Sequence, residues 1–200
     1  MSLDQEKYKN LKERFGAVSS WAIWKEPHET STSNIANLSV FDDPDILSKL
    51  NTGYVFVGLN AANHNQEQTE AWRSFHSEYR YQKDYKLRYA LMGDDRFWGS
   101  YITDVVKNYT ETDSIAVQQY IKKHPEFVMQ NLEVLKKELT LLGGKKPVLV
   151  ALGNAVYSLL KKNLKNEYEI KKIPHYSSYI SKENYRVKVQ EALKDCERLV

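Results

Sequence analysis

Four apolar runs along the chain predict β-strands. They cover residues 54–59, 101–106, 147–152 and 168–173. β-Branched, aliphatic and aromatic residues dominate the first three runs, a pattern typical of strands that are buried on both faces. The second run carries one carboxylate, Asp104, while the fourth alternates more and is followed by Pro174-His175. The chain is therefore expected to contain a sheet with a well-buried centre.

Patterns with helical spacing precede, separate and follow these runs. The predicted helices cover residues 3–15, a short segment opened by Asp43-Pro44, residues 113–142 with an interruption near Pro125, residues 154–162, and residues 181 to the C-terminus. Buried strands that alternate with helices are typical of a parallel sheet covered on both sides. We therefore expect an α/β fold.

Nothing in the sequence divides the chain into parts. It contains no internal repeat, low-complexity tract or Pro/Gly-rich linker, and 200 residues are enough for one sizeable core. A single domain over residues 1–200 is expected. Within it, residues 1–43 are predicted to form an N-terminal helix and an irregular, lid-like extension whose Trp21 and Trp24 can close over a cleft.

Composition narrows the class of protein. The chain has 42% hydrophobic and 28% charged residues, as globular proteins do, and its net charge of +3 permits a nucleic-acid partner without proving one. The single cysteine, Cys196, excludes a disulfide framework and a cysteine-based zinc or iron–sulfur site. No apolar run approaches the ~20 residues of a membrane helix, and residues 1–12 lack the apolar stretch of a signal peptide. We expect a soluble, cytoplasmic protein with no membrane partner.

Residues that follow the predicted strands are the first candidates for a site, because open α/β sheets bind ligands beyond the carboxyl ends of their strands. After the first strand, Gly58-Leu59-Asn60 offers close backbone approach and an amide that can hold a water or a base edge. A polar turn with capping asparagines is the alternative. After the third strand, Gly153-Asn154 opens a helix whose backbone N–H groups can bind an anion.

Two titratable residues stand out near the strand ends. His175 is flanked by hydroxyl-bearing residues and can donate a hydrogen bond to developing negative charge, or it is a loop histidine satisfied by backbone. Asp104 lies within an apolar strand, where a carboxylate costs several kcal/mol unless it is paired or faces a cleft. Pairing with Lys107 and a role in a site both suit its position.

Four segments at these strand ends, in this order, resemble motifs of the uracil-DNA glycosylase superfamily. Residues 58–60 resemble the Gly-Ile/Met-Asn motif of its mismatch-specific and single-strand-selective branches. Residues 100–107 resemble the Tyr-Ile-Thr-Asn-Val-Val-Lys strand of the thermostable bacterial and archaeal branch, and residues 148–160 resemble its next strand and helix. Residues 175–177, His-Tyr-Ser, resemble the His-Pro-Ser of the family's second catalytic loop. The resemblance covers residues 54–180. It implies a three-layer α/β/α sandwich with a central four-stranded parallel sheet and DNA across the strand ends.

The resemblance also implies roles for individual residues. Asn60 would position the attacking water, and His175 would hydrogen-bond the carbonyl oxygen of the departing base. The residues that bind substrate would be Gly58, Leu59, Phe75, Asp104, Asn154, Ser177 and Tyr179. Among these, Phe75 would stack on the flipped base, Ser177 would touch a phosphate, and Tyr179 would fill the gap in the duplex. For Phe75, a core position on a helix face is the alternative.

Departures from the family pattern bear on function. Asp104 stands where uracil-specific members have asparagine, and an ionised carboxylate only accepts hydrogen bonds. It would repel uracil O4 but accept from an exocyclic amine, so uracil is not expected to be the best ligand. Tyr176 replaces a proline, and proline is also absent after Asn60, which predicts loops of different shape. The cluster-binding cysteines of the thermostable branch are missing, so no cofactor is expected.

Two functions compete on these grounds. The first is a DNA glycosylase that hydrolyses an N-glycosidic bond. The second is a non-catalytic module that uses the same fold to bind nucleic acid, a nucleotide or a free base. A metal hydrolase built on His64, His76, His175 and Asp104 is a third hypothesis, but metal-ligand spacing such as His-Glu-x-x-His is absent, so no metal is expected.

Charged and aromatic clusters do not separate the first two functions. Lys145-Lys146 and Lys171-Lys172 are expected to precede their strands and to lie opposite the cleft. Tyrosines and arginines interleave over residues 79–89. That pattern suits a surface that stacks single-stranded bases, or one face of a helix packed on the sheet.

Overall fold

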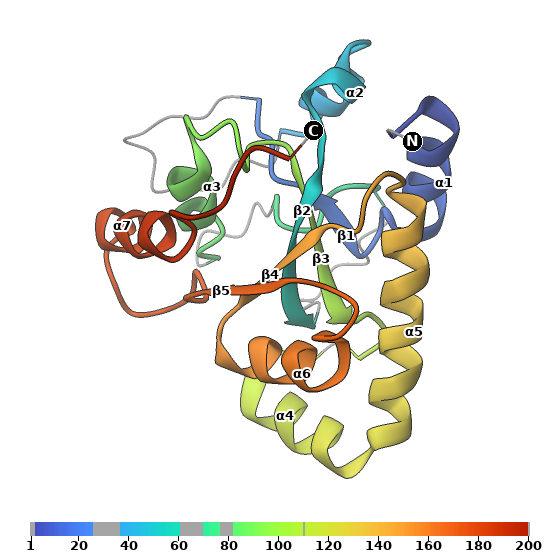
Figure 1. Cartoon of the computed structure of the whole chain (residues 1–200), viewed down its shortest axis with the longest axis vertical. Coiled ribbons are helices and arrows are strands. Elements are labelled where there is room, and N and C mark those ends of the chain that lie inside the picture. The colour runs from blue at the N-terminus through green and yellow to red at the C-terminus, as the bar shows by residue number, and fades with distance from the viewer. Residues whose placement is uncertain (1–2, 26–36, 61–69, 77–81, 110, 200) are drawn as a thin grey trace.

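One mixed sheet organises the protein (Figure 1). The computed structural model describes residues 3–25, 37–60, 70–76, 82–109 and 111–199. The strands are β1 (Ser19–Trp21), β2 (Asn51–Asn60), β3 (Ser100–Val106), β4 (Val148–Leu152) and β5 (Ile170–Ile173), in the order β1-β3-β2-β4-β5. The pairings β2–β3, β2–β4 and β4–β5 are parallel, while β1 pairs antiparallel with β3. All four predicted strands are confirmed, but the expected count of four is wrong for this sheet, because β1 adds an antiparallel edge.

The helices follow the predicted pattern with three differences. They are α1 (Gln5–Phe15), the 3-10 helix η1 (Ser39–Asp42), α2 (Ile46–Lys49), α3 (Tyr85–Leu91), α4 (Ser114–Lys123), α5 (Pro125–Leu141), α6 (Asn154–Leu164) and α7 (Lys182–Ala192). The expected break near Pro125 separates α4 from α5, since proline fits a first helical turn. The differences are that α7 ends at Ala192, that η1 was not predicted, and that α3 covers only the last part of the stretch 79–89, for which a helix was one of two interpretations. In the described ranges, no helix has the length and apolar character needed to cross a bilayer.

Helices cover both faces of the sheet, so the fold is α/β with three layers (Figure 1). Side chains of a strand alternate between its two faces. On β2, Val55 and Val57 therefore join the core cluster beneath α1, α5 and α6, whereas Tyr54 and Phe56 join the cluster beneath α3 and α7. We call these sides the α5–α6 face and the α3–α7 face.

The N-terminal segment differs from the expected lid. Ser19–Trp21 forms β1, and the hydroxyls of Ser19 and Ser20 donate to the carbonyls of Phe15 and Trp72, at 2.8 Å each. These bonds allow two serines to lie in a buried strand. Trp21 is fully buried, and Trp24 packs against His76 and Trp98. Both tryptophans thus belong to the core, and their predicted role over a cleft is wrong. Residues 26–36 of this segment lie outside the described residues.

Candidate functional site

The loop after β5 fixes the state of His175. The backbone N–H of Ser177 donates to His175 Nδ1 at 3.1 Å, and the Ser177 hydroxyl lies 2.7 Å from the same nitrogen. A neutral imidazole whose Nδ1 accepts a backbone hydrogen bond carries its proton on Nε2. Burial lowers the pKa of His175 to about 4, so the ring is neutral near pH 7. His175 therefore presents an oriented Nε2–H donor beyond the end of β5.

The turn between β4 and α6 supports this histidine. Gly153 has φ +95°, a backbone conformation that L side chains rarely adopt, and a Cβ added there would lie 3.3 Å from His175 Cβ. Its N–H donates to Ile173 O at 2.9 Å, which joins the ends of β4 and β5. The next residue, Asn154, begins α6, and its side-chain oxygen accepts from Lys172 Nζ at 3.1 Å.

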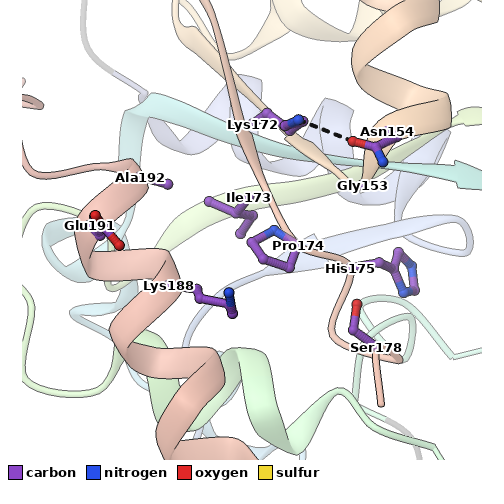
Figure 2. A pocket seen from close by; sticks show the side chains of 10 residues that line it. All are labelled: Gly153, Asn154, Lys172, Ile173, Pro174, His175, Ser178, Lys188, Glu191 and Ala192. Carbon is purple, nitrogen blue, oxygen red and sulfur yellow. Dashed lines mark hydrogen bonds between the residues drawn. The ribbon is translucent and has the colours of Figure 1, made fainter. Parts of the chain in front are cut away.

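A groove of about 540 Å³ runs beside this turn, between the end of β5 and α7 (Figure 2). Its lining residues are Gly153, Asn154, Lys172, Ile173, Pro174, His175, Ser178, Lys188, Glu191 and Ala192. Lys172 approaches from β5 and Lys188 from α7. The expectation that Lys171-Lys172 precede their strand is wrong, because β5 starts at Ile170 and includes both lysines. Lys145-Lys146 do precede β4, as predicted.

Gly58 and Asp104 lie directly opposite each other on β2 and β3. A Cβ at Gly58 would overlap Asp104 Oδ1. The sequence predicted that Gly58 allows a ligand to approach the backbone closely. In the structure, the group that lies against this glycine is the Asp104 carboxylate. Asp104 is only 5% exposed, and its burial raises its pKa to about 7. The charge of Lys107 opposes that rise and the charge of Glu138 adds to it.

Lys107 pairs with a residue that sequence reasoning missed. Its Nζ lies 2.7 Å from Glu138 Oε2, and it donates to Thr103 Oγ1 at 2.6 Å and to the backbone carbonyl of Asp104 at 2.7 Å. The pairing predicted between Lys107 and the Asp104 side chain is thus replaced by a buried ion pair to α5. Glu138 lies three residues after Leu135 and four before Leu142, on the apolar stripe of its helix. A carboxylate on such a stripe could have indicated a buried ion pair from the sequence alone.

Asn60 is held in place at the end of β2. Its Nδ2 donates to Tyr109 O at 3.3 Å and to Glu111 O at 2.7 Å, in the segment that follows β3. These two bonds orient the amide. Among the described residues, none donates to its Oδ1. Residues 61–64, which continue the predicted motif and include His64, lie outside the described part of the chain.

Leu59 and Phe75 fall on opposite faces of the sheet. Leu59 packs its side chain against the cluster of the α5–α6 face, whereas Phe75 packs against the cluster of the α3–α7 face. Phe75 has φ +66° and lies in a turn, so the helix of the alternative interpretation is wrong, whereas its packing against a core cluster agrees with that interpretation. A left-handed backbone is strained for an aromatic residue, and such strain clusters at functional sites.

The two tyrosines of the loop differ in exposure. The ring of Tyr176 lies 4.3 Å from that of His175, between centroids, and packs against the α3–α7 cluster. Burial raises the pKa of Tyr176 well above its ordinary value, and the charge of Asp104 adds to the rise. Tyr179, in contrast, is fully exposed at the tip of the loop.

The ring-and-cation stretch is a packed helix where the structure describes it. Arg88 is buried. The ring centroid of Tyr89 lies 4.7 Å from Nζ of Lys182 and 5.1 Å from Cζ of Arg186, and both of these residues are on α7. Residues 79–81 lie outside the described part of the chain. Over α3, the stretch therefore packs against α7 instead of offering free rings.

The residues of the third hypothesis do not form a described metal site. His76 is fully buried against Trp24 and Phe41, and this burial lowers its pKa to about 3. Over the ranges that the structure describes, no group of three or more His, Cys, Asp or Glu side chains is placed to hold a metal ion.

Comparison with known proteins identifies no relative of this chain. No family model, curated protein or solved structure matches the chain. The resemblance to the uracil-DNA glycosylase superfamily therefore rests on the motifs at the strand ends and stays a prediction.

Proposed function

We propose that this protein is a DNA glycosylase, which takes an extruded base at the carboxyl ends of its parallel strands and hydrolyses its N-glycosidic bond. The observation that carries the proposal is the neutral His175, whose Nε2–H is left as a donor. As the bond to the sugar breaks, negative charge develops on the base and positive charge on the sugar. A donor fixed where the negative charge appears stabilises that transition state more than the ground state.

Asn60 supplies the second half of the reaction. Because its Nδ2 is engaged by two backbone carbonyls, its Oδ1 has a fixed direction and can accept from a water molecule. The water oxygen bonds to the sugar carbon as the N-glycosidic bond breaks, the base leaves with the electron pair of that bond, and a water proton is released to solvent. Positioning of this kind contributes to rate because the water is already aligned.

Asp104 sets the expected base. Its buried carboxylate accepts hydrogen bonds once it is ionised, and so favours a base that carries an exocyclic amine over one that presents a carbonyl oxygen there. Uracil is therefore not proposed as the best substrate.

The surroundings of the site suit DNA. Tyr179 is an exposed ring at the loop tip that can fill the space left by an extruded base, and Phe75 offers a stacking surface. Lys172 and Lys188 line the neighbouring groove, where they can attract a phosphate backbone.

A non-catalytic binding module is the second candidate, and Tyr176 favours it. Where the family pattern has proline, this ring packs against His175 at a tilt of 33° and lies in the field of Asp104, so it takes up space beside the predicted base. Under this alternative the same edge of the sheet holds a nucleotide, nucleic acid or free base without cleavage.

Oligonucleotides that carry a panel of normal, deaminated and damaged bases separate the two candidates. The protein is incubated with each, and abasic sites and binding are both measured. Abasic sites that are lost in Asn60→Ala and His175→Ala but kept in His124→Ala, a histidine at the end of α4, support the glycosylase. Binding without abasic sites, unchanged in Asn60→Ala, supports the module. Absence of both rejects the two candidates together.

A further inference from the structure

A buried lysine holds the loop that carries His175 and Tyr179. Lys86, on α3, is 6% exposed. Its Nζ donates to the backbone carbonyl of Ser178 at 2.9 Å and to that of Ile180 at 2.8 Å. These carbonyls lie on either side of the exposed Tyr179, so both bonds end at the base of the loop tip.

The environment of this ammonium group is unusual. Burial lowers the pKa of Lys86, and in the part of the chain that the structure describes its Nζ forms no ion pair with a carboxylate. A cation taken out of water needs strong partners, and hydrogen bonds to a charged donor are about twice as strong as neutral ones. The two loop carbonyls are these partners. The lysine and the loop conformation therefore stabilise each other.

A second donor anchors the start of the loop. Tyr185, on α7, is fully buried, and its hydroxyl donates to the carbonyl of Pro174 at 3.0 Å. Within the loop, the N–H of Ser178 donates to His175 O at 2.9 Å and the N–H of Ile180 donates to Ser178 O at 2.8 Å. Side chains from two helices thus hold residues 174–180 at both ends.

The two anchors share one platform. The helices α3 and α7 pack together through Tyr89, whose ring lies close to the cations of Lys182 and Arg186. Arg186 also donates to Met92 O, just beyond α3, at 3.1 Å. Because α3 and α7 are joined in this way, Lys86 and Tyr185 keep a fixed separation. A fixed pair of anchors limits the conformations open to the loop.

We propose that Lys86 is a positioning residue, which together with Tyr185 holds the loop 174–180 in the conformation that aims His175 at the strand ends and exposes Tyr179. We call the bonds from Lys86 and Tyr185 to this loop the clamp. The clamp is a property of the folded chain, and only its effect on catalysis rests on the glycosylase proposal. Lys86 acts through the loop backbone, since its Nζ is buried beneath the loop.

Lys86→Met tests the clamp, because it keeps a chain of similar length and removes the donor. Two NMR readouts report on the loop: hydrogen exchange at the amides of Ser178 and Ile180, and the titration of the His175 ring. The variant is expected to exchange these amides about tenfold to a hundredfold faster, the range that loss of a charged hydrogen bond allows. The pKa of His175 is expected to rise from about 4 towards its ordinary 6.5 as the loop opens to water.

Controls separate the clamp from general destabilisation. Lys83→Met removes a nearby lysine whose Nζ lies 6.0 Å from the Tyr85 ring centroid, and both readouts should match the unmodified protein. Lys86→Arg keeps the cation and should restore much of the amide protection. Tyr185→Phe removes only the hydroxyl and should loosen the Pro174 end, so it carries the test if Lys86→Met does not fold.

Unchanged exchange and an unchanged His175 titration in folded Lys86→Met overturn the proposal. If that variant does not fold, an unchanged His175 titration in Tyr185→Phe overturns it, because the Tyr185 hydroxyl holds the neighbouring Pro174. Where the unmodified protein forms abasic sites, Lys86→Met should lower kcat more than it raises KM; equal kcat with a loosened loop would remove the catalytic consequence alone. If the unmodified protein forms no abasic sites, the glycosylase proposal fails, while the two NMR readouts still decide the clamp.

Discussion

At the scale of single residues, the contact between Gly58 and Asp104 is the tightest constraint on the site. The φ of Gly58 is not positive, so its backbone conformation does not require glycine. A larger residue is excluded there because its Cβ would overlap the Asp104 carboxylate. Gly58→Ala is expected to lower the free energy of unfolding by about 1–3 kcal/mol, the usual cost of added volume in a packed site. Urea denaturation measures this change.

The partner residue provides the control for that prediction. In an Asp104→Ala background the obstructing oxygen is gone, so Gly58→Ala should cost little, and the double-mutant cycle should show strong coupling. An equal cost in both backgrounds would mean that the carboxylate is not what requires a glycine at this position.

Burial of Asp104 also predicts how stability changes with pH. Its pKa of about 7 in the folded state exceeds the ordinary 3.8, so folding favours the protonated form. The stability this provides is present below pH 3.8 and is lost as pH rises through about 7. The full loss is about 4 kcal/mol, since one pKa unit corresponds to about 1.36 kcal/mol. Asp104→Asn should therefore gain stability relative to the unmodified protein between pH 4 and pH 7, with a constant difference above; a difference that is flat over this range would contradict the raised pKa.

At the scale of elements, a polar network inside the core joins β3 to α5 and β1. Glu138 Oε1 accepts from the hydroxyl of Thr103 at 2.8 Å. The Tyr101 hydroxyl lies 2.8 Å from Glu138 Oε1 and 2.6 Å from Ser19 Oγ, so its one proton has an acceptor on either side. Lys107 neutralises the same carboxylate. The network explains how the short, serine-rich β1 is held at the edge of the sheet.

Removing one charge from this network should be costly. Glu138→Gln keeps an oxygen acceptor for the hydroxyls but leaves the ammonium of Lys107, 8% exposed, without its counter-ion. The expected loss is about 3–5 kcal/mol, measured by chemical denaturation. The double variant Lys107→Met/Glu138→Leu, which buries no charge, should recover most of that loss. A double variant no more stable than Glu138→Gln would show that charge pairing is not the source of the cost.

The elements also show what sequence patterns can and cannot predict. The strands β2, β3 and β4 were predictable because each contains a run of apolar residues that only a buried position satisfies. β5 is apolar only at its two ends, and it was predicted from the alternation over residues 168–173. β1 was not predictable, because serines are typical of loops. Ser19 and Ser20 can be buried in a strand only because their hydroxyls donate to the carbonyls of Phe15 and Trp72. Lys86 was missed for a similar reason: its burial depends on carbonyls about ninety positions away in the chain.

At the scale of the whole molecule, sheet register assembles the candidate site. From the sequence, Gly58, Asp104, Gly153 and His175 were each predicted as candidate site residues separately, because each lies in or near the end of a predicted strand. Only the pairing of Gly58 with Asp104, and the seating of His175 on the Gly153 turn, show which of them touch. Contacts of this kind follow from register and chain reversal, which no local pattern encodes. Tyr179 is exposed at the loop tip, and its neighbour Ser178 lines the groove that Lys172 and Lys188 also line.

The most direct test of a base-cleaving site at this edge is abasic-site formation at a defined base, measured at pH 8, where Asp104 is ionised. Duplex and single-stranded oligonucleotides would carry either a base with an exocyclic amine or uracil at one position, and the unmodified protein would be compared with Asp104→Asn. We predict that the unmodified protein cleaves the amine-bearing base in preference, and that Asp104→Asn shifts the preference towards uracil by about tenfold or more, since a mismatched buried hydrogen bond is strongly selective. Uracil preferred by the unmodified protein, or no abasic site with any base, would contradict the account.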